Sequence, residues 1–322
     1  MCKLLVITGH LKQEIALRAI EACAEIFGQS QKDGFGFVAQ GADGLAYGQY
    51  LKVYPGWKKN LPEFITGQIA EEGTFPKFTQ TLVCHGRTST NVKQLTNCHP
   101  FKTGDLYLAH NGVLSWLGDK KTEPVSRAGC DSDAFLTWLY AGAIDPTTPQ
   151  SWDNCKANWG GYGAVALLDS ARHSLTVAKC DTARLSVSRR TQFRGWAFST
   201  DESDLERITT RANIKLDTRP LPVPRRIITF DKKGQIATER DWSGFGERAR
   251  DALFLKSYSG SGFGWSNPDA PKVADAPKVA GAPKVISKAT KRARARSIHS
   301  QWEAFPDWPG TDVSGTDVSE VL

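Results

Sequence analysis

The sequence predicts an α+β fold in which stacked, mostly antiparallel β-sheets carry helices on their outer faces. Two patterns indicate this fold. Apolar residues recur at helical spacing over residues 12–27 and again over residues 131–139. From residue 163 to about residue 240, short apolar runs separated by turn residues indicate repeated strands. Helices near the beginning and middle of such a chain are suited to covering the outer faces of the sheets.

The first fifty residues predict a strand, a helix and two more strands. Residues 3–8 form a largely apolar run, as in a buried strand. We expect the helix over residues 12–27 to end at Gly28, because glycine often follows a helix. The glycines on both sides of Phe35 predict that another backbone segment comes close. The two further strands are predicted at residues 33–39 and 44–53.

The middle of the chain predicts a strand that stops at Asn111-Gly112. Residues 105–110 and 112–116 have strand character, and an Asn-Gly pair favours positive φ and a tight turn. A strand that stops there exposes a side-chain amide beside a backbone N–H, and an oxyanion needs donors of this kind. Before it, we expect a short helix at residues 63–69, a strand at residues 81–85 and a polar loop at residues 88–104.

The second half predicts two helices followed by a meander. Asp131 is the expected N-cap of the helix that runs to Leu139, and a second short helix is expected at residues 151–157. The meander strands are predicted at residues 164–168, 174–179, 185–188, 196–199, 226–230 and 235–238.

Composition and cysteine usage suggest a cytoplasmic protein. The chain has 322 residues, no run of 18 apolar residues and no leader-like N-terminus, so we expect no membrane insertion. Its seven cysteines include no Cys-x-x-Cys pair, a usage typical of a reduced compartment. The net charge of +7 is modest for this length and does not by itself indicate a nucleic-acid binder.

Residues 2–245 are predicted to form one domain, and residues 246–322 a largely disordered tail. The tail contains three copies of Ala-Pro-Lys-Val, a composition that cannot build a core. Residues 261–300 hold eight Lys/Arg against two Asp, whereas residues 301–322 hold five Asp/Glu and no Lys or Arg. The basic run at residues 288–296 leaves nucleic-acid binding open, and the acidic end with its aromatic residues leaves partner binding open.

Cys2 is a candidate nucleophile. A small second residue favours removal of Met1, which would leave a free α-amine beside the Cys2 thiol. The amine has an ordinary pKa of about 7.7–8.0, so at neutral pH part of it is unprotonated and can accept the thiol proton. Such a nucleophile needs no His or Asp partner.

Three further segments carry groups that an amide-cleaving site needs. They are Cys84-His85-Gly86-Arg87-Thr88-Ser89-Thr90-Asn91, then Asn97-Cys98-His99-Pro100-Phe101 leading to Leu108-Ala109-His110-Asn111-Gly112, then Gly129-Cys130-Asp131-Ser132-Asp133. With Cys2, and in this order, they resemble class II glutamine amidotransferases of the N-terminal nucleophile hydrolase superfamily, most closely the small stand-alone glutaminases. The resemblance spans roughly residues 2–240 and includes the segments at residues 163–169 and 198–201.

The resemblance implies a four-layer αββα sandwich and a role for each motif. Cys2 is the expected nucleophile, and the Asn111 side-chain amide with the Gly112 N–H is the expected oxyanion hole. Arg87 is expected to bind the α-carboxylate of L-glutamine through its planar fork, and Asp131 its α-ammonium. Thr88 and Thr90 belong to the same expected substrate-binding segment. Neither a cofactor nor a metal is expected.

Two departures from the family pattern concern the pocket. Lys3 stands where a glycine commonly follows the nucleophile, and Thr88 stands where relatives often have an aromatic residue or Gln. The Cys-His pairs at residues 84–85 and 98–99 do not favour a zinc site, because neighbours on a strand point to opposite faces.

The leading functional hypothesis is a glutaminase that supplies ammonia to a separate synthase or ligase. Nothing after residue 240 resembles such an acceptor domain. One alternative is an N-terminal-Cys amidohydrolase acting on another amide, which the Arg87 and Asp131 pair disfavours. The other is an inactive fold that serves as a binding scaffold.

Overall fold

The computed structural model describes residues 2–31, 33–50, 75–88, 97–126, 128–143, 145, 147–180, 183–191, 195–242 and 244–246. These residues belong to one compact unit, Met1–Ser257. The expected helix at residues 63–69, the end of the strand predicted at 44–53, and residues 247–322 of the expected tail lie outside the described residues. No helix in the described ranges is long and apolar enough to cross a membrane.

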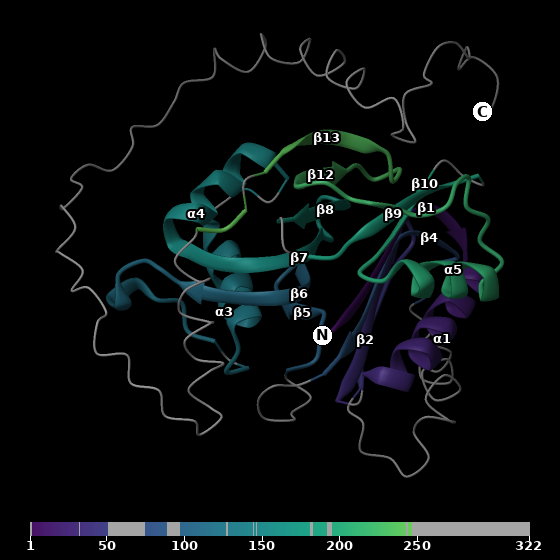
Figure 1. Cartoon of the computed structure of the whole chain (residues 1–322), viewed down its shortest axis with the longest axis horizontal. Coiled ribbons are helices and arrows are strands. Elements are labelled where there is room, and N and C mark those ends of the chain that lie inside the picture. Colours follow the sequence, from purple (N-terminus) through teal and green to yellow (C-terminus); the bar gives the residue numbers. More distant parts are fainter. Residues whose placement is uncertain are drawn as a thin grey trace, which may run out of the picture. The chain divides into compact units, whose positions relative to one another are not determined.

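Two antiparallel sheets make up the centre of the fold (Figure 1). In the described part of the chain, the first has the order β11-β9-β10-β1-β4-β2-β3 and the second the order β13-β12-β8-β7-β6-β5. The strands of the first are β1 (Lys3–Lys12), β2 (Gly34–Gly41), β3 (Leu45–Tyr50), β4 (Phe78–Arg87), β9 (Ser186–Arg190), β10 (Gly195–Ser199) and β11 (Leu221–Pro222). Those of the second are β5 (Phe101–Thr103), β6 (Leu106–Trp116), β7 (Trp159–Asp169), β8 (Ser174–Lys179), β12 (Arg226–Phe230) and β13 (Ile236–Asp241).

Helices cover the outer face of each sheet. Helices α1 (Gln13–Ser30) and α5 (Glu202–Arg211) pack on the first sheet. Helix α3 (Asp131–Trp138) packs on β5 and β6 of the second sheet, and the short α4 (Cys155–Asn158) packs on β7. The two pairs lie on opposite sides of the sheets in Figure 1. The predicted four-layer αββα sandwich is therefore confirmed.

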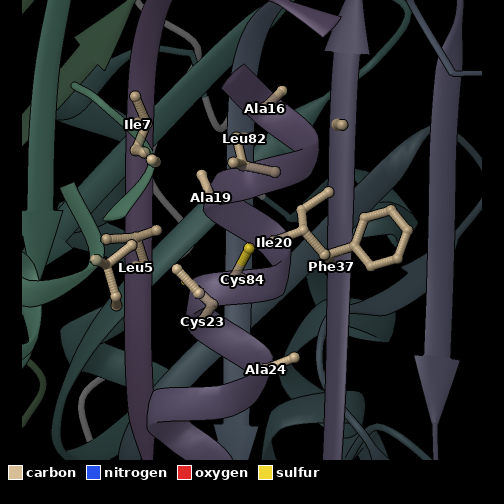
Figure 2. Close-up of a cluster of buried hydrophobic side chains, with 14 of the residues drawn as sticks. Leu5, Ile7, Ala16, Ala19, Ile20, Cys23, Ala24, Phe37, Leu82 and Cys84 are labelled. Atoms are coloured by element: carbon tan, nitrogen blue, oxygen red, sulfur yellow. The ribbon is translucent and has the colours of Figure 1, made fainter. Parts of the chain in front are cut away.

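Helix α1 is held by an apolar stripe that lies against the first sheet. Figure 2 shows Ala19, Ile20 and Cys23 on the helix face turned towards Leu5 and Cys84 of the strands. The prediction that α1 ends at Gly28 is wrong, because the helix continues to Ser30. Its last turns lie against β4 so closely that a side chain on Gly86 would overlap Phe27. This packing outweighs the cost of a glycine inside a helix, about 1 kcal/mol.

Strand β6 runs through Asn111-Gly112 without a break, so the predicted turn there is wrong. It pairs with β7 residue for residue from Leu106 to Trp116. A Cβ on Gly112 would lie 2.5 Å from the Gly163 Cα and closer still to the Tyr162 oxygen. The glycine therefore allows two strands to approach each other, and that continuous pairing prevails over the turn preference of the Asn-Gly pair.

The predicted meander is only partly right. β7, β8, β12 and β13 are neighbours in the second sheet, but β9 and β10 leave it and pair beside β1 in the first. Alternation of apolar residues identifies a strand but not its sheet. The ring of Phe198 on β10 meets that of Phe230 on β12 at 5.8 Å, between the sheets.

Three other elements differ from expectation. The segment predicted as a polar loop contains β5. Helix α5 was not predicted, although Asp201 accepts hydrogen bonds from the Ser203 and Asp204 N–H groups as an N-cap, and the buried Leu205 and Ile208 are spaced for a helix. The N-cap of α3 is Cys130, and Asp131 is its first helical residue. The expected close approach at Phe35 is confirmed, because side chains on the flanking glycines would overlap Cys98 and His99.

Candidate active site

Cys2 lies just before β1 and faces the second sheet. Along β1, Leu5 packs towards α1, whereas Leu4 pairs with His85 on the opposite face. Because side chains alternate along a strand, Cys2 shares the face of Leu4. Its Sγ donates to the Thr88 carbonyl oxygen at 3.7 Å. Cys2 is half-buried.

Burial raises the pKa of the Cys2 thiol above its ordinary value. The Thr88 carbonyl contact and the charge of Arg87 lower this pKa, and the charge of Asp131 raises it. Both charged groups are thus close enough to influence the sulfur. With its pKa raised, the thiol is protonated at neutral pH, and the site needs a base to generate the thiolate.

Arg87 ends β4 on the same face as His85, and its guanidinium is buried. It donates to the Asn97 carbonyl oxygen and interacts with the Cys98 thiol. The segment that carries these two residues crosses β2, where Gly34 leaves room for the Cys98 sulfur. Protein contacts therefore fix the planar fork beside Cys2 rather than leaving it in solvent.

The Asp131 carboxylate is anchored at the edge of β6. One oxygen accepts from the Leu114 N–H at 2.6 Å, and the other accepts from the Ser132 N–H at 2.8 Å. The Ser132 hydroxyl donates to the carboxylate at 3.3 Å and lies 2.9 Å from His110 Nδ1. Burial lowers the pKa of His110, so its ring is neutral and can donate from Nδ1 to that hydroxyl.

The Gly112 N–H points to the same edge of β6. Its partner Gly163 directs its own N–H and carbonyl to Cys180, away from β6, so Gly112 and Gly163 exchange no hydrogen bonds. Backbone N–H groups two residues apart on a strand point to the same edge. Since the Leu114 N–H donates to Asp131, the Gly112 N–H points to the edge where Asp131 lies. In the described ranges, β5 covers this edge only as far as Leu108. The edge beyond it presents the Gly112 N–H next to Asn111, whose side chain lies on the face turned to the first sheet.

A hydrogen bond joins the two sheets beside these groups. His85 Nε2 lies 3.2 Å from the His110 carbonyl oxygen. Burial lowers the pKa of His85 to about 3, so the ring is neutral. The sequence places His85 in a Cys-His pair that does not favour a zinc site. Its hydrogen bond to the His110 carbonyl oxygen depends on a packing of the two sheets that the sequence does not reveal. Within the described ranges, no group of three or more His, Cys, Asp or Glu side chains could hold a metal.

The structure brings most of the expected residues together. The charges of Arg87 and Asp131 both influence the Cys2 thiol. Strand β1, which follows Cys2, pairs with β4. On β4, His85 contacts the carbonyl oxygen of the β6 residue just before Asn111 and Gly112. Thr88 contributes its carbonyl oxygen, while its hydroxyl donates to Gln31 at the end of α1. Thr90 lies outside the described residues.

Lys3, the departure beside the nucleophile, points away from the site. Its ammonium pairs with the buried Asp204 carboxylate and lies 3.8 Å from that of Asp201. Both carboxylates belong to the start of α5, on the outer side of the first sheet. The lysine therefore ties β1 to α5 and leaves the face that carries Cys2 unchanged.

A cavity of about 560 Å³ lies on the other side of β1 from Arg87. Lys179, Leu185, Thr200 and Asp201 are among the residues that line it. It touches the nucleophile strand through the Thr200 hydroxyl, which accepts from the Leu4 N–H at 3.0 Å. None of the expected site residues that the structure describes is among those that line it.

Comparison with known proteins supports the fold. No protein-family profile matches the chain, and no curated protein does. A glutamine phosphoribosylpyrophosphate amidotransferase from B. subtilis, solved with ADP and GMP, is similar in structure, with a TM-score of 0.51 and 14% identity. A structure described as the allosteric regulatory enzyme of purine biosynthesis is similar too, with a TM-score of 0.52 and 15% identity. Each match covers 74% of this chain but only 49% of the other, so the chain spans about half the length of these structures. The two sheets and their helices form the N-terminal nucleophile hydrolase fold.

Proposed function

We propose that this chain is a glutaminase of the class II amidotransferase type. Cys2 would cleave the side-chain amide of L-glutamine, and the ammonia would pass to a separate acceptor enzyme. The observation that carries the proposal is the arrangement around one thiol. Cys2 contacts the carbonyl oxygen of Thr88, which directly follows the buried Arg87. The Asp131 carboxylate is anchored at the β6 edge that presents the Gly112 N–H. A guanidinium and a carboxylate together match the carboxylate and ammonium of a free amino acid. The fold shared with a glutamine amidotransferase supports the same conclusion.

The reaction would begin with Met1 removal, which frees the Cys2 α-amine. The amine accepts the thiol proton, and the thiolate attacks the amide carbon. The carbonyl oxygen becomes an oxyanion that the Gly112 N–H and the Asn111 amide stabilise, and one such donor contributes about 100- to 1000-fold in rate. Collapse of the intermediate breaks the C–N bond, and the departing nitrogen takes the proton from the amine to leave as ammonia. Water then hydrolyses the γ-glutamyl thioester to glutamate and restores the thiol.

Two measurements test the proposal. Intact mass after incubation with a glutamine-mimicking diazoketone reports both loss of Met1 and a single adduct at Cys2. Ammonia release from L-glutamine is then compared among the wild type, Cys2→Ala and Cys130→Ala. Cys130 is a matched control, since it is also half-buried and also feels the charges of Arg87 and Asp131.

We expect activity in the wild type and in Cys130→Ala and none in Cys2→Ala. Ammonia release by Cys2→Ala would contradict the assignment of the nucleophile. A folded wild type that neither forms the adduct nor releases ammonia would favour the binding scaffold. Activity on other amides but not on L-glutamine would favour the alternative amidohydrolase.

A further inference from the structure

We propose that His85 is a positioning residue that sets the oxyanion donors of β6 against the nucleophile on β1. The inference rests on the proposed function, since it concerns the same reaction. His85 acts through the backbone of β6, because its ring contacts the His110 carbonyl oxygen.

The first observation is the place of His85 between the two halves of the site. On one side, it pairs in register with Leu4, two residues after Cys2. On the other, its Nε2 lies 3.2 Å from the His110 carbonyl oxygen. That carbonyl belongs to the peptide bond that leads into Asn111, so the bond reaches the residue before the expected oxyanion donors. One side chain thereby links the strand of the nucleophile to the strand of the oxyanion hole.

The second observation is the direction of the groups on β6. The His110 carbonyl, the Gly112 N–H and the Leu114 N–H all point to the edge that faces away from β7. His85 holds the first of them, and Asp131 holds the last. The Gly112 N–H lies between these two anchored points, so His85 and Asp131 together fix its direction.

The third observation is the state of the ring. A carbonyl oxygen only accepts hydrogen bonds, so Nε2 must carry the hydrogen. The ring is fully buried, and the His99 ring meets it edge-on at 4.3 Å. The pKa of His85 is lowered to about 3 by this burial, so the donor persists throughout the working pH range. Such a residue suits a permanent link between sheets and not proton transfer.

The test compares His85→Leu with His85→Gln. Leucine removes the donor, whereas a glutamine amide can place an N–H near the position of Nε2. We expect His85→Leu to lower kcat for L-glutamine by about 10- to 100-fold with KM changed less than about twofold, because a 1 Å displacement of catalytic groups can cost about 100-fold. We expect His85→Gln to recover kcat to within about fivefold of the wild type. Alkylation of Cys2 by iodoacetamide needs no oxyanion hole and should proceed at the wild-type rate in both variants.

Several results would overturn the proposal. A His85→Leu variant with kcat within about twofold of the wild type would do so, and so would a His85→Gln variant as impaired as His85→Leu. Nitrogen-15 spectra of the histidine rings in the wild type provide a test that requires no variant to fold. They should show a neutral Nε2–H ring at pH 7 and at pH 5, and a protonated ring or an Nδ1–H form at pH 7 would refute the proposal. A wild type that releases no ammonia would overturn the proposed function as well, whereas an active wild type with an unaffected His85→Leu overturns only this inference.

Discussion

The Leu114 N–H donates to the Asp131 carboxylate at 2.6 Å, so one side chain docks helix α3 on β6 and faces the candidate site. The carboxylate has structural and proposed substrate-binding roles at once, and two substitutions separate them. Asp131→Asn keeps an oxygen that can accept from Leu114 but removes the charge for an ammonium ion. Asp131→Ala removes both.

For Asp131→Asn we expect a KM for L-glutamine raised about 10- to 100-fold, because a charge-assisted hydrogen bond is lost. Its loss of stability should be smaller than that of Asp131→Ala, because the amide keeps one of the two acceptor oxygens. Asp131→Ala should in addition lower the free energy of unfolding by about 1–3 kcal/mol, because it leaves a backbone donor without its acceptor. Steady-state kinetics and urea unfolding measure the two effects. If Asp131→Asn keeps the wild-type KM, Asp131 does not bind the ammonium.

Arg87→Lys should impair glutamine binding more than turnover. A lysine keeps the positive charge near Cys2 but cannot reproduce the two parallel N–H donors of a guanidinium. We expect KM to rise about tenfold or more while kcat falls less, as determined from initial rates over a range of L-glutamine concentrations. An unchanged KM would show that the α-carboxylate binds elsewhere.

Gly112→Ala should destabilise the protein through a steric clash. A Cβ there would lie 2.6 Å from His110 Nε2 and closer to the Tyr162 backbone, so β6 and β7 would have to separate. We expect a loss of about 1–3 kcal/mol or more in the free energy of unfolding, together with loss of activity.

Gly142→Ala is the matched control. Its φ is +83°, but no atom of the described residues lies within 4 Å of the added Cβ, so only backbone strain of about 1–2 kcal/mol applies. This variant should remain active. A Gly112→Ala protein as stable as the wild type would mean that the strands are not as close as the structure indicates.

The expected chemistry could be read from linear motifs, but its geometry could not. The order of Cys2, Arg87 and Asp131 along the chain was enough to suggest the same residues that the structure brings together. The direction of the Gly112 N–H was predicted for the wrong reason, since it depends on which residues of β6 face β7 and not on a turn. The His85 contact with His110 joins two sheets whose packing is set by the whole core, and no local pattern encodes it.

The buried histidines should make stability depend on pH. Burial lowers the pKa of His85, His99 and His110, so all three rings are neutral in the fold. In the unfolded chain each takes up a proton below about pH 6.5. The unfolded state then binds more protons, so their contribution is fully present above pH 6.5 and is lost as pH falls towards the folded pKa values.

For His85, with a pKa of about 3 in the fold, the loss in the free energy of unfolding at pH 5.5 relative to neutral pH should be about 1.4 kcal/mol. Urea unfolding at pH 7.5 and pH 5.5 measures the loss, and His85→Gln should show a loss smaller by about that amount. Equal losses in the two proteins would indicate that His85 is already protonated in the fold.

The folded domain should tolerate removal of the residues after Ser257 but not of those from Gly244 onward. Phe245 is buried, and its ring lies 4.9 Å from that of Trp242 and 5.7 Å from that of Phe135. The Gly246 N–H donates to the Trp159 carbonyl oxygen at 2.8 Å. These contacts attach the end of the described chain to the aromatic core under α3.

A chain that ends at Ser257 should keep the wild-type melting temperature and glutaminase activity, because all the candidate site residues precede residue 132. A chain that ends at Ser243 loses the Phe245 side chain from the core, and such a truncation costs about 3–5 kcal/mol. Phe245→Ala in the full chain is the matched control and should lose a similar amount. If the chain ending at Ser257 loses glutaminase activity while remaining folded, the residues beyond it contribute to the site. If it releases ammonia normally but no longer supports synthesis by the acceptor enzyme, those residues recruit that partner.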